Sequence, residues 1–540
     1  MSIELSQERR TGMSQEQFAP YHYDRKHRIS GLIAIFLVYG TMSYYIQATN
    51  IARPAMAASF TSTALISWSV SIPALAGAFV TLIFGKLSDL YGRRIMLLIS
   101  VTFALIGTVL SALSPTFIFL IFSNSIGSLG IGAMTPLVMA VAGDMYPPVE
   151  VSKWIGLLNI PLGIATLLGN VVGGYITETF SWNSVFWSVV PLLILCIVMV
   201  PVGILPLTSG GIEHKIDIKG CVLALLASST TIIGISIAGS HYSWMSVQVL
   251  SLLGVSLISW ILFFQTETRA REPILDPRLF HNRSFNTIAA TTFLSTFGQI
   301  GMMVYFLMFM QGVQGIRTSI SGWIFFPFTF LMAFFGVPVG FLISRTRRYK
   351  YLYIVGFFIV TVQMTGTLFL KAETPAGWCL LAAVIGGIGL GAIPTVNTVV
   401  VQNAIPKRLL GAAMGALFFS LLMGISISPA LLNYAMNSTY ADSLDLPEGL
   451  NQVQDRSILE DVRRPDILQS ETERTRLKEK FERMGSEGTV LFQLTFDAIR
   501  NAMESGLRKV FLIGAITALL SFLLILTIPE VPLGSGIDPE

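Results

Sequence analysis

The segment GKLSDLYGRR has the residue types and spacing that could do the most specific chemistry in this sequence. It places Asp89 shortly before Arg93 and Arg94. A carboxylate and guanidinium groups at this spacing can form charge-assisted hydrogen bonds, and a carboxylate is also stabilised at a helix N-terminus. Gly85 and Gly92 permit close packing and tight turning. The segment therefore predicts an ionic contact at the ends of helices.

A second set of polar side chains lies inside long apolar stretches. Its members are amides, which need hydrogen-bonding partners or water when they are buried. Two interpretations remain open, because such amides can join helices to one another or can line a wet cavity and bind a substrate. The set comprises Gln47, Asn50, Asn124, Asn159, Asn170, Gln299, Gln311, Gln363 and Asn397.

The sequence offers no recognisable catalytic or metal-binding constellation. The three cysteines lie in apolar runs without CxxC spacing, and the five histidines fall outside these runs, which argues against metal or haem ligation. No GxxxxGK[ST] motif is present, so an ATP-driven pump is disfavoured. We therefore expect no enzyme activity, no catalytic residue, no metal and no cofactor.

The composition indicates that a lipid bilayer surrounds the chain. Only 12% of the residues are charged and 53% are hydrophobic, whereas soluble proteins have about 25% charged residues. The net charge of +4 is small and gives no reason to expect a nucleic-acid partner. Runs of about 20 apolar residues predict membrane helices rather than barrel strands. The expected spans are 29–50, 64–85, 94–114, 117–143, 153–175, 185–206, 217–239, 245–265, 286–312, 319–343, 351–371, 377–403, 410–436 and 509–528.

Lysines and arginines gather in alternate loops, which predicts the orientation of these spans. By the positive-inside rule both termini lie in the cytoplasm, and an even number of about fourteen spans preserves the alternation. Residues 437–508 form a long extracytoplasmic loop of mixed charge. Within this loop we expect a solvated helix over 471–483 and a segment at 491–507 that lies against the membrane surface.

Two parts of the chain resemble each other, which predicts an internal repeat. Gly130 and Gly132, followed by Pro136, match a second GxGA stretch that begins at Gly389 and is followed by Pro394. Repeated six-helix halves allow rocking about a central site. The expected organisation is an all-α membrane fold with a cytoplasmic tail at 1–28, a first half at 29–206, an inserted helix pair at 217–265, a second half at 286–528 and a second cytoplasmic tail at 529–540.

The segment from Gly85 to Arg94 resembles motif A of the major facilitator superfamily. This resemblance implies two six-helix halves that are latched by Asp89, Arg93 and Arg94, with Asp144 placed like the partner acid of the family. The inserted helix pair and the link at 272–285 resemble the fourteen-helix branch of drug:proton antiporters, and the turn containing Gln311 resembles the next turn of that branch.

The fifth expected span resembles the antiporter motif of that branch, called motif C. It carries a series of glycines, with Asn170 where the family usually has proline. Small residues let helices approach closely, so close packing and a gating role both remain open. The glycines are Gly156, Gly163, Gly169, Gly173 and Gly174.

The chain departs from the family at the two positions associated with proton coupling. Tyr45 stands where the branch has an aspartate, and Ile126 stands where it has an arginine. No charged residue lies in the middle of an expected span, although a proton carrier in the membrane is normally an acid or a histidine. Proton coupling would therefore need an acid at the end of a span, such as Asp144, or a substrate that carries its own proton. Neutral, zwitterionic or anionic substrates are favoured over cationic ones.

The expected function is export of a small organic molecule by alternating access, either as a multidrug pump or as a dedicated exporter of a metabolite such as a siderophore. An importer and a non-transporting membrane sensor with the same fold are the alternatives, since fold does not fix function. The expected location is a bacterial inner membrane, with the bilayer and a small-molecule substrate as partners. We expect a monomer, with or without a periplasmic adaptor.

Overall fold

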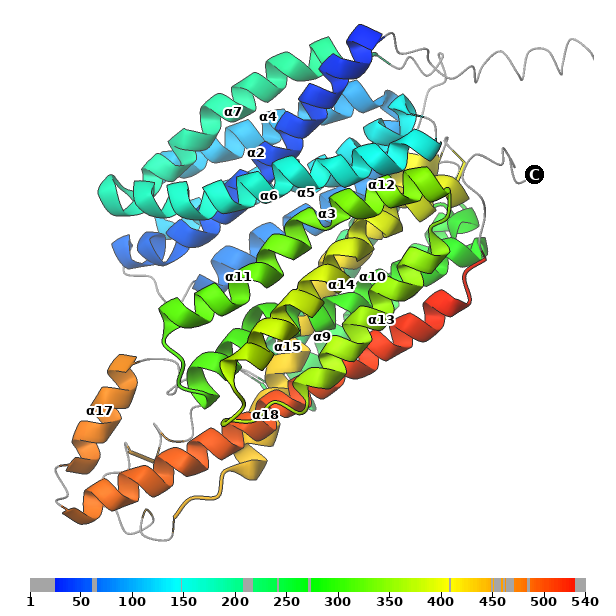
Figure 1. Cartoon of the computed structure of the whole chain (residues 1–540). Helices are drawn as coiled ribbons and strands as arrows, with labels where there is room; N and C mark the ends of the chain where they lie inside the picture. The colour runs from blue at the N-terminus through cyan, green and yellow to red at the C-terminus, as the bar shows by residue number, and fades with distance from the viewer. Residues whose placement is uncertain are drawn as a thin grey trace, which may run out of the picture.

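The computed structural model shows an all-helical molecule (Figure 1). Its helices run roughly along one common direction, with the helices of the first part of the chain (blue to cyan) beside those of the last part (green to red). The structure describes residues 25–60, 66–146, 148–206, 217–239, 242–270, 273–406, 409–447, 450, 458–459, 462, 471–482 and 486–529. Most of both expected tails and much of the loop at 437–508 lie outside the described residues.

The first six long helices pack on one another. Helix α2 contacts α5, α6 and α7, while α3 and α4 pack against α5. Gly92 turns the chain between α3 and α4. Its φ of 92° is a backbone conformation in which a residue with a side chain would be strained. The helices are α2 (Arg25–Ser59), α3 (Ile66–Tyr91), α4 (Arg93–Ala112), α5 (Phe117–Met145), α6 (Pro148–Thr179) and α7 (Trp182–Gly203).

Helices α8 (Ile218–Ile237) and α9 (Val247–Glu267) form a hairpin between the two larger groups of helices in the chain order. Asp217 caps α8 by accepting the Gly220 N–H at 2.9 Å. Helix α8 packs on α9 and also contacts α3 and α15. The hairpin therefore touches helices from both ends of the sequence.

The remaining long helices form the second group. Helix α10 continues into two π-helical stretches, and α11 and α12 follow each other closely enough to form one span. Helix α14 packs on α11 and α13, and α18 packs on α10, α13 and α15. The elements are α10 (Arg283–Ile300), η3 (Gly301–Phe306), η4 (Phe309–Val313), α11 (Thr318–Phe334), α12 (Gly336–Thr346), α13 (Lys350–Thr367), α14 (Ala376–Ala404), α15 (Leu410–Ser443) and α18 (Ser486–Leu526).

The apolar runs predicted as spans are helical in the structure. Within the described residues, thirteen helical stretches are long and apolar enough to cross a membrane. The remaining expected span, at 351–371, corresponds to α13, a helix of 18 residues that packs between α14 and α18. The fold class expected from the sequence is thus confirmed.

The prediction that residues 491–507 lie against the membrane surface is wrong. They form the first part of α18, which runs for 41 residues without a break. At 1.5 Å per residue this helix is about 60 Å long, roughly twice the thickness of the hydrocarbon core. Ile499, Met503 and Leu507 recur at helical spacing and are buried, so packing along one helix face explains the continuous helix.

A further helix, α17 (Glu471–Glu482), packs on the projecting part of α18 (Figure 1). The helix expected at 471–483 is therefore present. It is not solvated on all sides, because Leu477 and Phe481 are buried and Phe481 contacts the Phe492 ring edge-on.

Candidate conformational latch and substrate-cavity residues

Arg93 lies at the centre of the predicted ionic contact. Its side chain is only 4% exposed, with Nη1 2.6 Å from Asp89 Oδ1 and Nε donating to Asp144 Oδ2 at 2.9 Å. Nη1 also donates to the Ser88 hydroxyl. The guanidinium group therefore holds the ends of α3 and α5 together through two carboxylates, which are strong hydrogen-bond acceptors.

Asp89 extends this contact to a helix from the other end of the chain. Its Oδ1 accepts the Gly411 N–H at 2.9 Å, and its Oδ2 accepts the Ala412 N–H at 2.8 Å. These amides belong to the first turn of α15, where N–H groups have no partner within the helix and the helix dipole favours a negative charge. Asp89 thus joins α3 to the N-terminus of α15. We call Asp89, Arg93, Asp144 and the first turn of α15 the latch.

Glycines allow this close approach of α3 and α15. A Cβ added to Gly85 would lie 2.4 Å from the Gly411 carbonyl oxygen and 2.9 Å from the Gly415 Cα. A Cβ on Gly411 would meet the Arg93 guanidinium group and Asp89 Oδ1. Any larger residue at Gly85 or Gly411 therefore requires the two backbones to separate.

Arg94 is not part of these contacts, although the resemblance implied that it would be. It is half-buried and makes no ion pair or hydrogen bond with the residues that the structure describes. Of the two adjacent arginines, only Arg93 forms ion pairs with the part of the chain that the structure describes.

A second pair of helices is joined near the same end of the molecule. Gly156 of α6 faces Gly340 of α12, and a Cβ at either position would lie within 3.1 Å of the other Cα. Asn159 Nδ2 donates to Thr395 Oγ1 at 3.2 Å. Among the described residues, the side-chain hydrogen bonds between α2–α7 and α10–α18 lie at the latch end of these helices. The molecule is therefore closed at the latch end.

Tyr45, at the position where the resembling branch has an aspartate, has a neutral partner. Its hydroxyl donates to Asn124 Oδ1 at 2.7 Å, and both side chains are buried. Ile126, at the position where the resembling branch has an arginine, lines a hollow with Leu110 and Phe122. The structure thus brings Tyr45 together with Asn124, a pairing that sequence reasoning did not identify.

The Tyr45–Asn124 bond predicts the effect of a mild substitution. Tyr45→Phe leaves the Asn124 carbonyl group buried without its donor, which costs about 1–3 kcal/mol. We expect the thermal unfolding midpoint of the purified protein to fall by a few degrees. Tyr175→Phe is the matched control, because Tyr175 is exposed and makes no hydrogen bond with the described residues. Equal midpoints for the two variants would show that the bond does not contribute to stability.

The other predicted amides fall into two groups. Asn159, Gln311 and Asn397 have protein partners: Gln311 donates to Ser321 at 2.9 Å, and Asn397 bonds Thr292 and Tyr353. Their bonds join helices, as the first interpretation holds. The amides without a hydrogen-bonded oxygen or nitrogen among the described residues are Gln47, Asn50, Asn170, Gln299 and the buried Gln363, which bonds only the Met302 sulfur.

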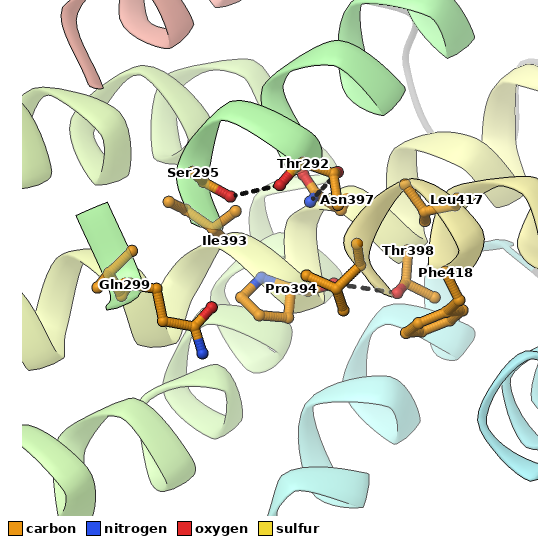
Figure 2. A pocket seen from close by; sticks show the side chains of 11 residues that line it. Thr292, Ser295, Gln299, Ile393, Pro394, Asn397, Thr398, Leu417 and Phe418 are labelled. Atoms are coloured by element: carbon orange, nitrogen blue, oxygen red, sulfur yellow. Dashed lines mark hydrogen bonds between the residues drawn. The ribbon is translucent and has the colours of Figure 1, made fainter. Parts of the chain in front are cut away.

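A small cavity lies between α10, α14 and α15 (Figure 2). It has a volume of about 60 Å³, and the predicted residues Gln299 and Asn397 both line it. Asn397 is turned toward Thr292, with a bond of 2.9 Å, while Gln299 lies apart from these bonded residues. Gln299 is therefore the amide of this cavity that remains available to a ligand.

The predicted glycines occupy close contacts between helices. A Cβ on Gly169 or Gly173 would lie 2.8 Å from Gln47 Cβ or Ala48 Cα of α2, and one on Gly163 would meet the Phe334 ring. Added Cβ atoms on Gly130 and Gly132 would meet the backbones of α4 and α3. Gly174 has more room, with Ile51 3.6 Å away. Close packing is thus observed for the first five of these glycines.

These features define an all-helical, multi-pass membrane protein. Residues 32–429 match the family model described as Major Facilitator Superfamily. The match covers most of the chain, and the chain belongs to the major facilitator superfamily (MFS).

The sequence identity between this chain and individual relatives is low. An uncharacterized MFS-type transporter of Mycobacterium tuberculosis H37Rv is 29% identical to this chain over 379 residues. The match covers 70% of this chain and 55% of that relative, so the chain spans about half the length of that relative. The multidrug transporter protein MdtP of Bacillus subtilis is 26% identical over 412 residues, 76% of this chain and 75% of the relative. The structure of the human organic anion transporter MFSD10 shares the fold with a TM-score of 0.59 at 12% identity, covering 92% of this chain and 99% of that chain.

Proposed function

We propose that the chain is a secondary active exporter of a small organic molecule and belongs to the fourteen-helix drug:proton antiporter branch. The α8–α9 hairpin between the two groups of helices supports this branch. Relatives named as multidrug and efflux transporters, including MdtP of Bacillus subtilis and the MFS efflux transporter aclA of Aspergillus oryzae, support export. The proposed location is a bacterial inner membrane with both termini in the cytoplasm, and the proposed oligomeric state is a monomer.

The formed latch is the observation that best supports a transport function. In alternating access, one group of helices rocks against the other around a central site. Opening the latch end would break the bonds from Asp89 to the α15 N-terminus and separate Gly85 from Gly411. We propose that 29–206 and 286–528 are the two moving halves, and that the structure represents the state open at the opposite, extracytoplasmic end.

The substrate is proposed to be neutral, zwitterionic or anionic. The buried Tyr45–Asn124 pair carries no charge where the family has an aspartate, so this position lacks a carboxylate for a cationic drug. Gln47, Asn50, Asn170 and Gln299, which have no oxygen or nitrogen partner among the described residues, offer both donors and acceptors to a substrate. Gly169, the residue before Asn170, packs on Gln47 Cβ, so both amides belong to the contact of α2 with α6.

The unbonded amides give a direct test of substrate binding. Asn170→Leu is expected to remove one hydrogen bond to the substrate, worth about 0.5–1.5 kcal/mol, and to raise KM by roughly two- to ten-fold. Transport kinetics in membrane vesicles measure this change. Gln265→Leu is the control, since Gln265 is an exposed amide on α9. An unchanged KM for Asn170→Leu would exclude Asn170 from the binding site.

Untargeted mass spectrometry of culture medium tests the proposed export and names the cargo. A deletion strain is compared with its complemented parent under iron-rich and iron-poor growth. We expect a compound that disappears from the medium and accumulates inside the deletion strain. A compound that instead fails to enter the deletion strain would establish import and contradict the proposal.

A further inference from the structure

Two acidic side chains meet at the latch end of the α8–α9 hairpin. Asp217 lies at the N-cap of α8, and Glu267 is the last residue of α9. Glu267 is 98% buried, with 2% of its surface exposed. Neither residue belongs to the latch or to the amides proposed to bind substrate.

Each of these carboxyl groups uses only one oxygen in a hydrogen bond. Asp217 Oδ1 accepts the Gly220 N–H at 2.9 Å, and Glu267 Oε2 accepts the Leu275 N–H at 3.1 Å. The other oxygens, Asp217 Oδ2 and Glu267 Oε1, are buried and have no hydrogen-bonding partner among the residues that the structure describes. A buried acceptor without a partner is costly, and a buried charge is more so.

Gly220 shows that these two unpartnered oxygens face the same point. A Cβ added to Gly220 would lie 2.7 Å from Asp217 Oδ2 and 2.8 Å from Glu267 Oε1. The absent side chain of Gly220 thus leaves a space that both oxygens border. Two ionised carboxylates cannot share such a space without strong repulsion.

The described cations around the pair are Lys86 of α3, and Lys219 and Arg269, which line the solvent-facing hollow beside Asp217. Lys86 of α3 is the ammonium group that acts on Glu267, and it acts on Asp276 as well. Arg278 is committed to Asp276, with Nη2 2.8 Å from Oδ2. Burial favours a higher pKa for Asp276, but the hydrogen bonds and charge of Arg278 outweigh burial and lower it. Arg269 is exposed to solvent beside Asp217.

We propose that Asp217 and Glu267 bind one proton between them. The proton bonded to one of the two unpartnered oxygens donates to the other, so a single O–H···O bond satisfies both and removes one negative charge. The solvent supplies the proton through the hollow lined by Asp217, Thr266 and Arg269. No covalent bond other than the O–H bond changes.

This proton site lies beside the latch. Helix α8 contacts both α3 and α15, the helices that Asp89 joins. Lys86 precedes Asp89 by less than one turn of α3. Loss of the shared proton would therefore add a negative charge next to the latch. The protonation of the hairpin pair is thus coupled to the opening and closing of the latch end.

Infrared spectroscopy of the full-length purified protein tests the site without reference to transport. A protonated carboxyl has a C=O stretching band that an ionised carboxylate lacks, and free Asp and Glu, with pKa values of about 4, are ionised at pH 6. We expect such a band at pH 6 that is lost in Glu267→Gln and in Asp217→Asn. The double variant should lose no more than either single variant, because one proton is shared.

Asp276→Asn is the matched control, since Asp276 is equally buried but paired with Arg278, and its spectrum should keep the band. Folding is preserved by design, because asparagine caps a helix as well as aspartate does and the glutamine oxygen can still accept the Leu275 N–H. A band that survives either single substitution would overturn the proposal. A band that vanishes when sodium chloride replaces choline chloride would also overturn it, because a metal cation would then occupy the site.

Discussion

Arg93→Ala is expected to lower strongly the population of the conformation that is closed at the latch end. The substitution leaves Asp89, 5% exposed, and Asp144, 20% exposed, without their shared cation. Removing one partner of a buried charge pair costs about 3–5 kcal/mol, and at about 1.4 kcal/mol per factor of ten the closed population falls roughly a hundred-fold or more. The distance between spin labels at exposed Ile95 and Leu342, measured by pulsed electron resonance, should shift to longer values.

The neighbouring arginine supplies the control for this experiment. Arg94→Gln removes the same charge from the same segment, but Arg94 makes no ion pair with the described residues. Its distance distribution should match that of the unsubstituted chain. If Arg94→Gln opened the latch end as much as Arg93→Ala, local charge rather than the ion pairs would hold the closed conformation.

Gly85→Val should block closure by a steric route that leaves every charge in place. The added Cβ would lie 2.4 Å from the Gly411 carbonyl oxygen and 3.2 Å from the Gly415 N, which are backbone atoms that cannot rotate away. Helices α3 and α15 must separate, which also breaks the two bonds from Asp89 to α15. We expect transport to fall at least ten-fold, with the spin-label distance again longer.

Gly366→Val on α13 is the control for added volume. A Cβ at Gly366 meets nothing within 4 Å, so this variant should keep the closed conformation and the transport rate. Normal transport by Gly85→Val would show that the contact of α3 with α15 is not needed in the cycle.

The latch illustrates how far the sequence could lead. The spacing of Asp89, Arg93 and Arg94 predicted an ionic contact at helix ends, and the structure contains one. The partner of Asp89 could not be predicted, since Gly411 and Ala412 donate to it from backbone N–H groups, which every residue except proline has. The different fates of Arg93 and Arg94 also depend on tertiary packing.

The amides show a similar limit. Apolar surroundings predicted that each would need a partner, but only the fold decides whether a partner is near. Asn397 meets Thr292, which is far away in the sequence, while Gln299 on the same cavity finds only the sulfurs of Met303 and Met332 at 3.9 and 4.0 Å. The substrate roles of the unbonded amides stay a prediction.

The long helix α18 shows where apolar content alone misleads. Hydropathy marked only its last part, from 509, as a span, because charged residues such as Arg500 and Glu504 interrupt the preceding stretch. In the structure Arg500 bonds the Val313 carbonyl group and Glu504 pairs with Arg508, so these charges have partners along one continuous helix. The sequence signal for this extension is the helical spacing of the apolar residues that are buried there, Ile499, Met503 and Leu507.

The most direct measurement tests in living cells whether export of the compound depends on the latch. The deletion strain is complemented with the unsubstituted chain, Arg93→Ala or Arg94→Gln at equal membrane abundance, and the exported compound is quantified in the medium by mass spectrometry. We expect the unsubstituted chain and Arg94→Gln to restore the compound outside the cells, and Arg93→Ala to leave it inside. Full restoration by Arg93→Ala would contradict the proposal that this transporter works by forming and breaking the Asp89–Arg93–Asp144 latch.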